Sequence, residues 1–219
     1  MKEHVIAFAK NHPLTIEQIK QLAGFTTRNQ AAVWTAQMRK QDRLTYVGSL
    51  KNGIGRPLDV LCNGWQPKLD NLRHEIKGTA FCIAYYFALL AFGITPLFRR
   101  GYYVGEFRPD IEMVIGDTTY LIEIDCGTMT KPQVKRRWQK YKKCEDTILI
   151  VAVSNPLRAI DSNERIQELI RWSPDLYEKA VFTTLEHLVS DPLGAVYWDA
   201  EESRNRSLNF TQSPTLIAT

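Results

Sequence analysis

Four acidic residues interrupt two segments that otherwise have the composition of buried strands. The segment 107–128 reads FRPDIEMVIGDTTYLIEIDCGT, and its regularly spaced acidic residues are Asp110, Glu112, Glu123 and Asp125. Carboxylates bind divalent cations and serve as acids or bases in catalysis. Two of them placed close together need a positive group between them, or a raised pKa that keeps one of them protonated.

A tight turn at Gly116-Asp117 would bring these carboxylates to one face of a hairpin. With a two-residue loop, Ile115 pairs with Thr118, and Asp110 then falls opposite Glu123. Because side chains alternate along a strand, the Ile-rich positions share a core face and the acidic positions share the other. Opposed Cβ atoms lie about 5 Å apart, so the two carboxylates would repel. A Mg²⁺ ion held between them meets this requirement, and a solvated face with scattered charges is the alternative.

A basic segment, KPQVKRRWQKYKK, follows the hairpin and predicts a helix from Pro132 to Lys143. Its inward stripe at helical spacing is formed by Val134, Trp138 and Tyr141. The basic side chains left facing outward are Lys135, Arg136, Arg137, Lys140 and Lys143. Arg136, Arg137 and Lys140 are therefore candidates for contacts with DNA phosphates, and a merely solvated face is the alternative.

The first 65 residues predict three short helices followed by two strands, LTYVGSL and RPLDVL. The third helix is predicted to begin near Thr27 and to turn Ala32, Val33 and Ala36 inward. This order of elements is that of a winged helix-turn-helix. Such modules bind DNA, and some serve instead in protein interaction or dimerisation.

In a DNA-binding winged helix, the third helix enters the major groove and the hairpin contacts the backbone or the minor groove. The matching candidates lie at the start of that helix and in the hairpin turn, and they are Thr27, Arg28, Asn29, Gln30, Lys51 and Arg56. The net charge of +4 and the isoelectric point near 8.8 are compatible with double-stranded DNA as the partner.

A second domain is predicted over residues 66–203, after a break at Gly64–Pro67. A long apolar helix from Leu69 to Phe92 is expected to be its central packing helix. The β-branched run Thr147–Val153 is typical of a strand buried on both faces of an α/β sheet. The fold class is thus α+β or α/β, and residues 204–219 are predicted to form a loose tail.

Composition argues for a cytoplasmic protein without a membrane partner. No apolar run reaches the roughly 18 residues of a membrane span, and no signal-peptide pattern follows the first residue. The four cysteines lack CxxC spacing, which predicts reduced thiols rather than a zinc site or disulfides.

The pattern Pro109-Asp110, a turn, and then Glu123-Ile124-Asp125 before a basic helix is similar to the PD-(D/E)xK nuclease superfamily. The expected order of helix, three strands, helix and strand also resembles the core of that family. The resemblance implies a Mg²⁺ site at Asp110 and Glu123, joined by Glu75. The position of the lysine that helps to activate water in that family is occupied here by Asp125. Asp125 would then be a further metal ligand or a water-positioning group. Lys135 or Lys142 would have to supply the positive charge that the lysine normally provides. Whether the protein is an endodeoxyribonuclease is left open by this replacement.

A second resemblance covers nearly the whole chain. The winged helix, His74 near the start of the long helix, the RPD sequence ending at Asp110, the E-x-D-x-G-T motif (123–128) and Lys140-Tyr141 together look like the replication-relaxation family. This family occurs on plasmids and conjugative elements. The resemblance implies a DNA-binding accessory protein that acts with a relaxase, a transposase or other mobile-element proteins. A Mg²⁺-dependent endonuclease and a transcriptional regulator are the alternatives.

Overall fold

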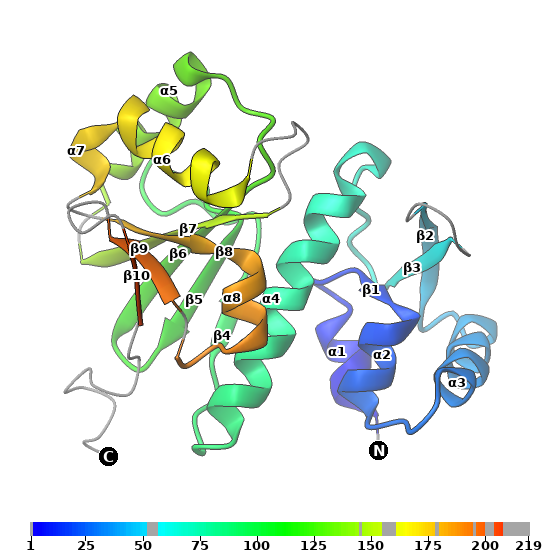
Figure 1. Cartoon of the computed structure of the whole chain (residues 1–219). Coiled ribbons are helices and arrows are strands. Elements are labelled where there is room, and N and C mark those ends of the chain that lie inside the picture. The colour runs from blue at the N-terminus through cyan, green and yellow to red at the C-terminus, as the bar shows by residue number, and fades with distance from the viewer. Residues whose placement is uncertain are drawn as a thin grey trace. The chain divides into compact units, whose positions relative to one another are not determined.

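The computed structural model shows a mixed α+β fold, as predicted (Figure 1). The structure describes residues 2–51, 57–144, 146–154, 161–177, 180–194, 196–199 and 204–207. The chain divides into two compact units, Met1–Ile83 and Ala84–Thr219.

The described part of the first unit holds three short helices and a small antiparallel sheet. Its elements are α1 (Glu3–Phe8), β1 (Leu14–Thr15), α2 (Ile16–Ala23), α3 (Arg28–Lys40), β2 (Thr45–Leu50), β3 (Leu58–Cys62), the 3-10 turn η1 (Leu69–Asn71) and the first half of α4 (Leu72–Leu90). The strand order is β1-β3-β2. Residues 52–56, which include the candidate Arg56, lie outside the described residues.

Side-chain capping sets where α3 begins and which of its faces is buried. Thr27 caps the helix in a capping box with Gln30. The buried positions are Ala31, Thr35 and Met38, at helical spacing. The predicted inward face was therefore wrong: Ala32 is only partly buried, Val33 is 72% exposed and Ala36 is exposed. Choosing the buried face from apolar residues alone selects the wrong side of the helix, because the polar Thr35 is buried and the apolar Val33 is exposed.

The first half of α4 packs with the first unit, although the sequence predicts the boundary before this helix. Thr79 Oγ1 donates to the carbonyl of Pro13 at 2.9 Å, and Gln18 Nε2 donates to the carbonyl of Ile76 at 3.2 Å. Ile83 belongs to the hydrophobic core of the first unit. The predicted division at residue 65 thus differs from the division into compact units, which falls within α4.

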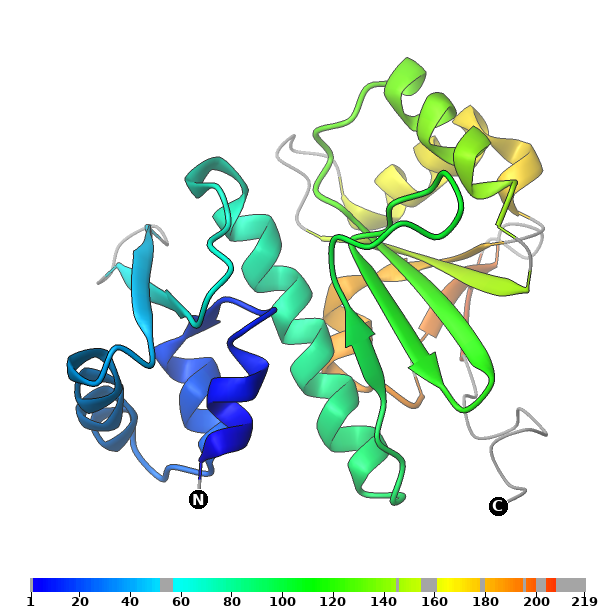
Figure 2. The same cartoon turned by 180° about the vertical axis from the view of Figure 1, so that it is seen from behind.

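A five-stranded sheet in the order β4-β5-β6-β7-β8 forms the centre of the second unit (Figure 2). Its strands are β4 (Leu97–Arg99), β5 (Ile111–Ile115), β6 (Thr118–Asp125), β7 (Thr147–Val153) and β8 (Ala180–Thr184). The first three are antiparallel, whereas β6, β7 and β8 run parallel. Ile115 pairs with Thr118 and Ile111 with Ile122, which confirms the predicted hairpin register.

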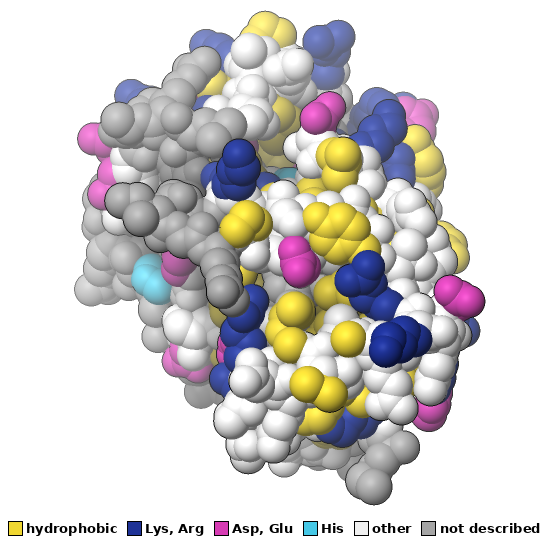
Figure 3. Space-filling model, turned by 90° about the vertical axis from the view of Figure 1, so that its right-hand side faces the viewer, with side chains coloured by type: hydrophobic (Ala, Val, Ile, Leu, Met, Phe, Trp, Pro, Cys, Tyr) yellow, Lys and Arg dark blue, Asp and Glu magenta, His cyan; other side chains and the backbone are white. Residues whose placement is uncertain are grey.

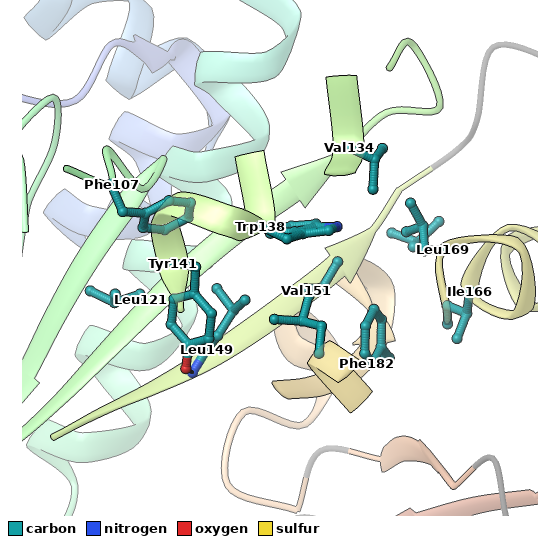
Figure 4. Close-up of a cluster of buried hydrophobic side chains, with 12 residues drawn as sticks. Phe107, Leu121, Val134, Trp138, Tyr141, Leu149, Val151, Ile166, Leu169 and Phe182 are labelled. Atoms are coloured by element: carbon teal, nitrogen blue, oxygen red, sulfur yellow. Dashed lines mark hydrogen bonds between the residues drawn. The ribbon is translucent and has the colours of Figure 1, made fainter. Parts of the chain in front are cut away.

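Helices cover both faces of this sheet. They are α5 (Lys131–Tyr141), α6 (Ser162–Trp172), α7 (Pro174–Tyr177) and α8 (Leu185–Ser190). Apolar residues of α5, α6 and α7 pack on one face in a single buried cluster (Figure 4). Trp138 of α5 lies at its centre beside Leu149 and Val151 of β7, and α8 lies on the opposite face (Figure 1).

A two-stranded hairpin, β9 (Val196–Asp199) and β10 (Arg204–Ser207), completes the described chain. The segment predicted to be a loose tail therefore begins with a strand. Its polar composition gave no sign of this, because the antiparallel backbone pairing of β10 with β9 does not depend on an apolar pattern. Residues 208–219 of that predicted tail lie outside the described residues. Among the described helices, none has both the length and the apolar character of a membrane span.

Candidate functional site

The acidic residues of β6 lie on a buried face rather than a solvated one. Glu123 and Asp125 alternate with the Ile positions of β6 and share their face with Leu121, which packs in the cluster beneath α5 and α6. Each of the two acidic side chains is 2% exposed. The solvated-face alternative is therefore wrong, because α5 and α6 cover this side of the sheet.

A guanidinium from α5 lies between the two carboxylates that the hairpin brings together. Arg137 donates through Nε and Nη2 to the two carboxylate oxygens of Glu123, each at 2.6 Å. Its Nη2 also lies 3.7 Å from Oδ1 of Asp110. The positive group expected between Asp110 and Glu123 is thus an arginine of this chain. Burial opposes the charge on Arg137, but Glu123 and Asp110 outweigh it and raise the pKa of the guanidinium.

A second arginine, which sequence reasoning missed, neutralises Asp125. Arg165 of α6 donates through Nε to Asp125 Oδ2 at 2.6 Å and through Nη2 to Oδ1 at 3.4 Å. It also donates to Glu168 Oε2 and to the carbonyl of Met129. Helical spacing could have predicted that Arg165 is buried. It lies four residues before Leu169 and therefore on the apolar face of α6.

Glu112, the acidic residue of β5, is also paired with an arginine. Arg99 Nη1 of β4 lies 3.3 Å from Glu112 Oε2, across the antiparallel pairing of these two positions. Each of the four regularly spaced acidic residues of the segment 107–128 therefore lies within 4 Å of an arginine nitrogen.

These donor sets do not fit the predicted Mg²⁺ site. Both oxygens of Glu123 accept from Arg137, and both oxygens of Asp125 accept from Arg165, with Oδ1 accepting also from the Gly127 N–H. Asp110 Oδ2 accepts from the Ile124 N–H at 2.8 Å. Within the described residues, no group of three His, Cys, Asp or Glu side chains has the arrangement of a metal site.

The remaining residues predicted for a nuclease site are Lys142, Lys135 and Glu75. Lys142 Nζ lies 2.7 Å from Asp175 Oδ2, and together with the nearby charge of Lys135 it lowers the pKa of that carboxyl. Lys135 itself is exposed on α5. Glu75 lies on α4 in the first unit, where its carbonyl accepts from Thr79 Oγ1.

The DNA-binding candidates of the first unit separate into capping and exposed residues. Thr27 Oγ1 accepts from the Gln30 N–H at 3.2 Å, and Gln30 Oε1 accepts from the Thr26 hydroxyl at 2.9 Å. Arg28 and Asn29 are exposed in the first turn of α3. Lys51 is exposed at the end of β2, where its carbonyl accepts from an arginine of α4.

The exposed side of α3 borders an open groove lined by Lys2, Gly24, Phe25, Thr26, Asn29, Gln30, Val33, Trp34 and Gln37. On the side of the molecule seen in Figure 3, Lys and Arg side chains lie among hydrophobic ones. The groove is lined by hydroxyl and amide side chains and one lysine, and its apolar part includes Phe25 and Trp34, whose rings contact each other.

The helix α5 begins one residue before and ends two residues before the predicted bounds, and its predicted outward face differs at one position. Arg136 and Lys140 are exposed, as expected. Arg137 instead turns toward the sheet and pairs with Glu123. Its position three residues after Val134 and four before Tyr141 places it at the edge of the buried stripe.

Comparison with known proteins adds no relative. No protein-family model, no curated protein and no solved structure matches this chain.

Proposed function

We propose that the protein is a DNA-binding accessory factor for the processing of plasmid or other mobile-element DNA. In this proposal the first unit is a winged helix-turn-helix, and the second is a degenerate PD-(D/E)xK-like domain that does not cut. The mobile-element setting, with a relaxase or transposase as partner, comes from the resemblance of the E-x-D-x-G-T motif and the order of elements to the replication-relaxation family.

The observation that carries the DNA-binding proposal is the exposed face of α3. This helix contains no acidic residue, and the capping box at Thr27 presents Arg28 and Asn29 at its N-terminal turn. Arginine recognises guanine and asparagine recognises adenine through paired hydrogen bonds in the major groove. The exposed Val33 and Ala36 are small and apolar, which suits close approach and contact with thymine methyl groups.

The arginine pairs on β6 favour a domain without nuclease activity. A cation at Asp110 and Glu123 would have to displace Arg137 from two hydrogen bonds of 2.6 Å. Asp125, in place of the usual lysine, is held by the buried Arg165. The endonuclease alternative retains one supporting observation, which is the convergence of Asp110 and Glu123 on a single guanidinium.

DNA binding is tested by fluorescence anisotropy on labelled random-sequence duplex over a series of salt concentrations. Wild type should bind with an affinity that falls steeply with salt. Arg28→Ala should weaken binding and, because it removes one positive charge beside the phosphates, reduce the slope of log K against log salt by about 1. Lys10→Ala removes the same charge from an exposed position of the first unit outside α3, and it should bind like wild type. Equal losses in the two variants would refute the proposed role of α3.

The absence of cutting is tested on supercoiled, linear and branched DNA with Mg²⁺ or Mn²⁺. Wild type is compared with an Asp110→Ala/Glu123→Ala variant. We expect both proteins to leave the DNA intact while wild type binds it. Nicking by wild type alone would establish the endonuclease and overturn the accessory role.

A further inference from the structure

The loop between β4 and β5 exposes two adjacent aromatic side chains. Tyr102 and Tyr103 are 63% and 66% exposed, within the sequence RRGYYVGEFR (99–108). Exposed aromatic rings beside arginines are the composition of surfaces on which unstacked bases lie.

This loop is fixed by its own packing. Val104 and Phe107 exchange backbone hydrogen bonds at 2.8 and 3.1 Å around a turn at Gly105. Phe107 is buried in the cluster beneath α5, where its ring contacts Tyr141. The two tyrosines therefore project from an anchored turn, which reduces the entropy lost when a ligand binds them.

Arg108 supports the aromatic pair from the other side of the turn. Its guanidinium carbon lies 5.8 Å from the centroid of the Tyr103 ring. The same guanidinium approaches Gly101 so closely that a Cβ atom there would lie 3.0 Å from Nη2, and Gly101 has a positive φ of 73°. A residue with a side chain at position 101 would therefore disturb both the turn and Arg108.

The basic face of α5 adjoins the loop. Lys143 Nζ lies 2.7 Å from Glu106 Oε1, Cys144 Sγ donates to the carbonyl of Val104 at 3.2 Å, and Arg137 Nη2 donates to the carbonyl of Arg108 at 3.2 Å. Arg136, Lys140 and Lys143 are exposed at helical spacing along this helix and its end. Pairing with Lys143 offsets the charge of Glu106, so the surface keeps a net positive charge.

We propose that the loop between β4 and β5 (residues 100–110, the tyrosine loop) and α5 together form a binding surface for single-stranded DNA. Bases stack on Tyr102 and Tyr103, and the phosphates follow Arg136 and Lys140 on α5. This inference rests on the proposed function in taking DNA as the ligand. It adds a single-stranded site on the second unit to the duplex site proposed on α3.

The test uses the full chain and fluorescein-labelled oligo(dT) of about 15 nucleotides, a length within the range of single-strand sites. Loss of stacking in Tyr102→Ala/Tyr103→Ala should weaken binding at least about fivefold. Tyr102→Phe/Tyr103→Phe keeps the aromatic faces and should bind like wild type. Phe92→Ala removes an aromatic side chain of equal exposure that precedes β4 rather than follows it, and it should have no effect.

Several results would overturn the inference. They are failure of wild type to bind oligo(dT) at low salt, unchanged binding by the double alanine variant, an equal loss in Phe92→Ala, and tighter binding of oligo(U) than of oligo(dT). Duplex binding is measured on the same proteins together with Arg28→Ala. If duplex binding fails while oligo(dT) binding depends on the tyrosines, the proposed role of α3 falls and the single-stranded site stands.

Discussion

Replacing Arg165 by Met should destabilise the second unit strongly, because this arginine neutralises a carboxylate that has no access to water. Arg165 is 3% exposed on its side chain, and its partner Asp125 is 2% exposed. The guanidinium makes hydrogen bonds to Asp125, Glu168 and the Met129 carbonyl, and its central carbon lies 4.9 Å from the Trp172 ring centroid. Methionine fills much of the volume of the arginine stem but supplies none of these donors.

The size of the effect follows from the charge that remains. Removing one partner of a buried ion pair costs about 3–5 kcal/mol, because the other charge is left without compensation. A protein of this kind has a total stability of about 5–15 kcal/mol, so the loss is a large part of it. With a urea dependence of about 2 kcal/mol per molar, the unfolding midpoint of the second unit should fall by roughly 2 M.

The assay is urea unfolding followed by tryptophan fluorescence, with hydrogen exchange of peptides from β6 and β7 to assign the transition to the second unit. Arg136→Met is the matched control, since it makes the same substitution at an exposed position of α5. Its midpoint should stay close to that of wild type.

A double-mutant cycle separates lost pairing from lost packing. Asp125→Asn removes the buried charge, so adding Arg165→Met to it should cost much less than Arg165→Met costs in wild type. If the two substitutions are additive, or if Arg165→Met unfolds at the wild-type midpoint, then the pair with Asp125 does not stabilise the fold and the reasoning fails.

Three further predictions concern the backbone, pH and thiols. Gly24→Ala should lower the free energy of unfolding by roughly 1–2 kcal/mol in a thermal or urea melt, because position 24 has a φ of 65°, which is costly for a residue with a Cβ atom. The new Cβ meets no other atom, so no packing contact offsets this cost. Burial raises the pKa of the Tyr85 phenol above its ordinary value near 10, so its contribution to stability is complete below that pH and is lost as pH rises above it. The stability of wild type should therefore fall more steeply above pH 10 than that of Tyr85→Phe. In native protein, iodoacetamide should modify Cys126 before the buried Cys62 and Cys82, as mass spectrometry would show.

The hairpin could be predicted because its determinants are local. Alternation of side chains and the Gly116-Asp117 turn fix the β5–β6 register, and the continuous β-branched run fixes β7. Alternation also shows that Glu123 and Asp125 share a face. It does not show what covers that face, because the cover comes from α5 and α6, which follow later in the chain.

The two arginine partners were harder to predict for different reasons. Arg137 lies at the edge of the stripe formed by Val134 and Tyr141, so a helical wheel leaves its direction undecided until a carboxylate lies within reach. Arg165 is forty residues from Asp125, and nothing in the local sequence of α6 names its partner. Charged residues on an apolar stripe are nevertheless a usable signal, because a buried charge requires a partner of opposite sign.

The E-x-D spacing of β6 therefore has a structural role, which the motif alone does not suggest. Residues two apart on a strand face the same way, and here one binds an arginine of α5 while the other binds an arginine of α6. Each acidic residue thus fixes one helix to the sheet through a guanidinium of opposite charge. Arg137 also donates to the carbonyl of Arg108, so Glu123 holds both α5 and the tyrosine loop in place. Under the proposed function, these carboxylates act on DNA binding through the surfaces that they position, without contacting the nucleic acid themselves.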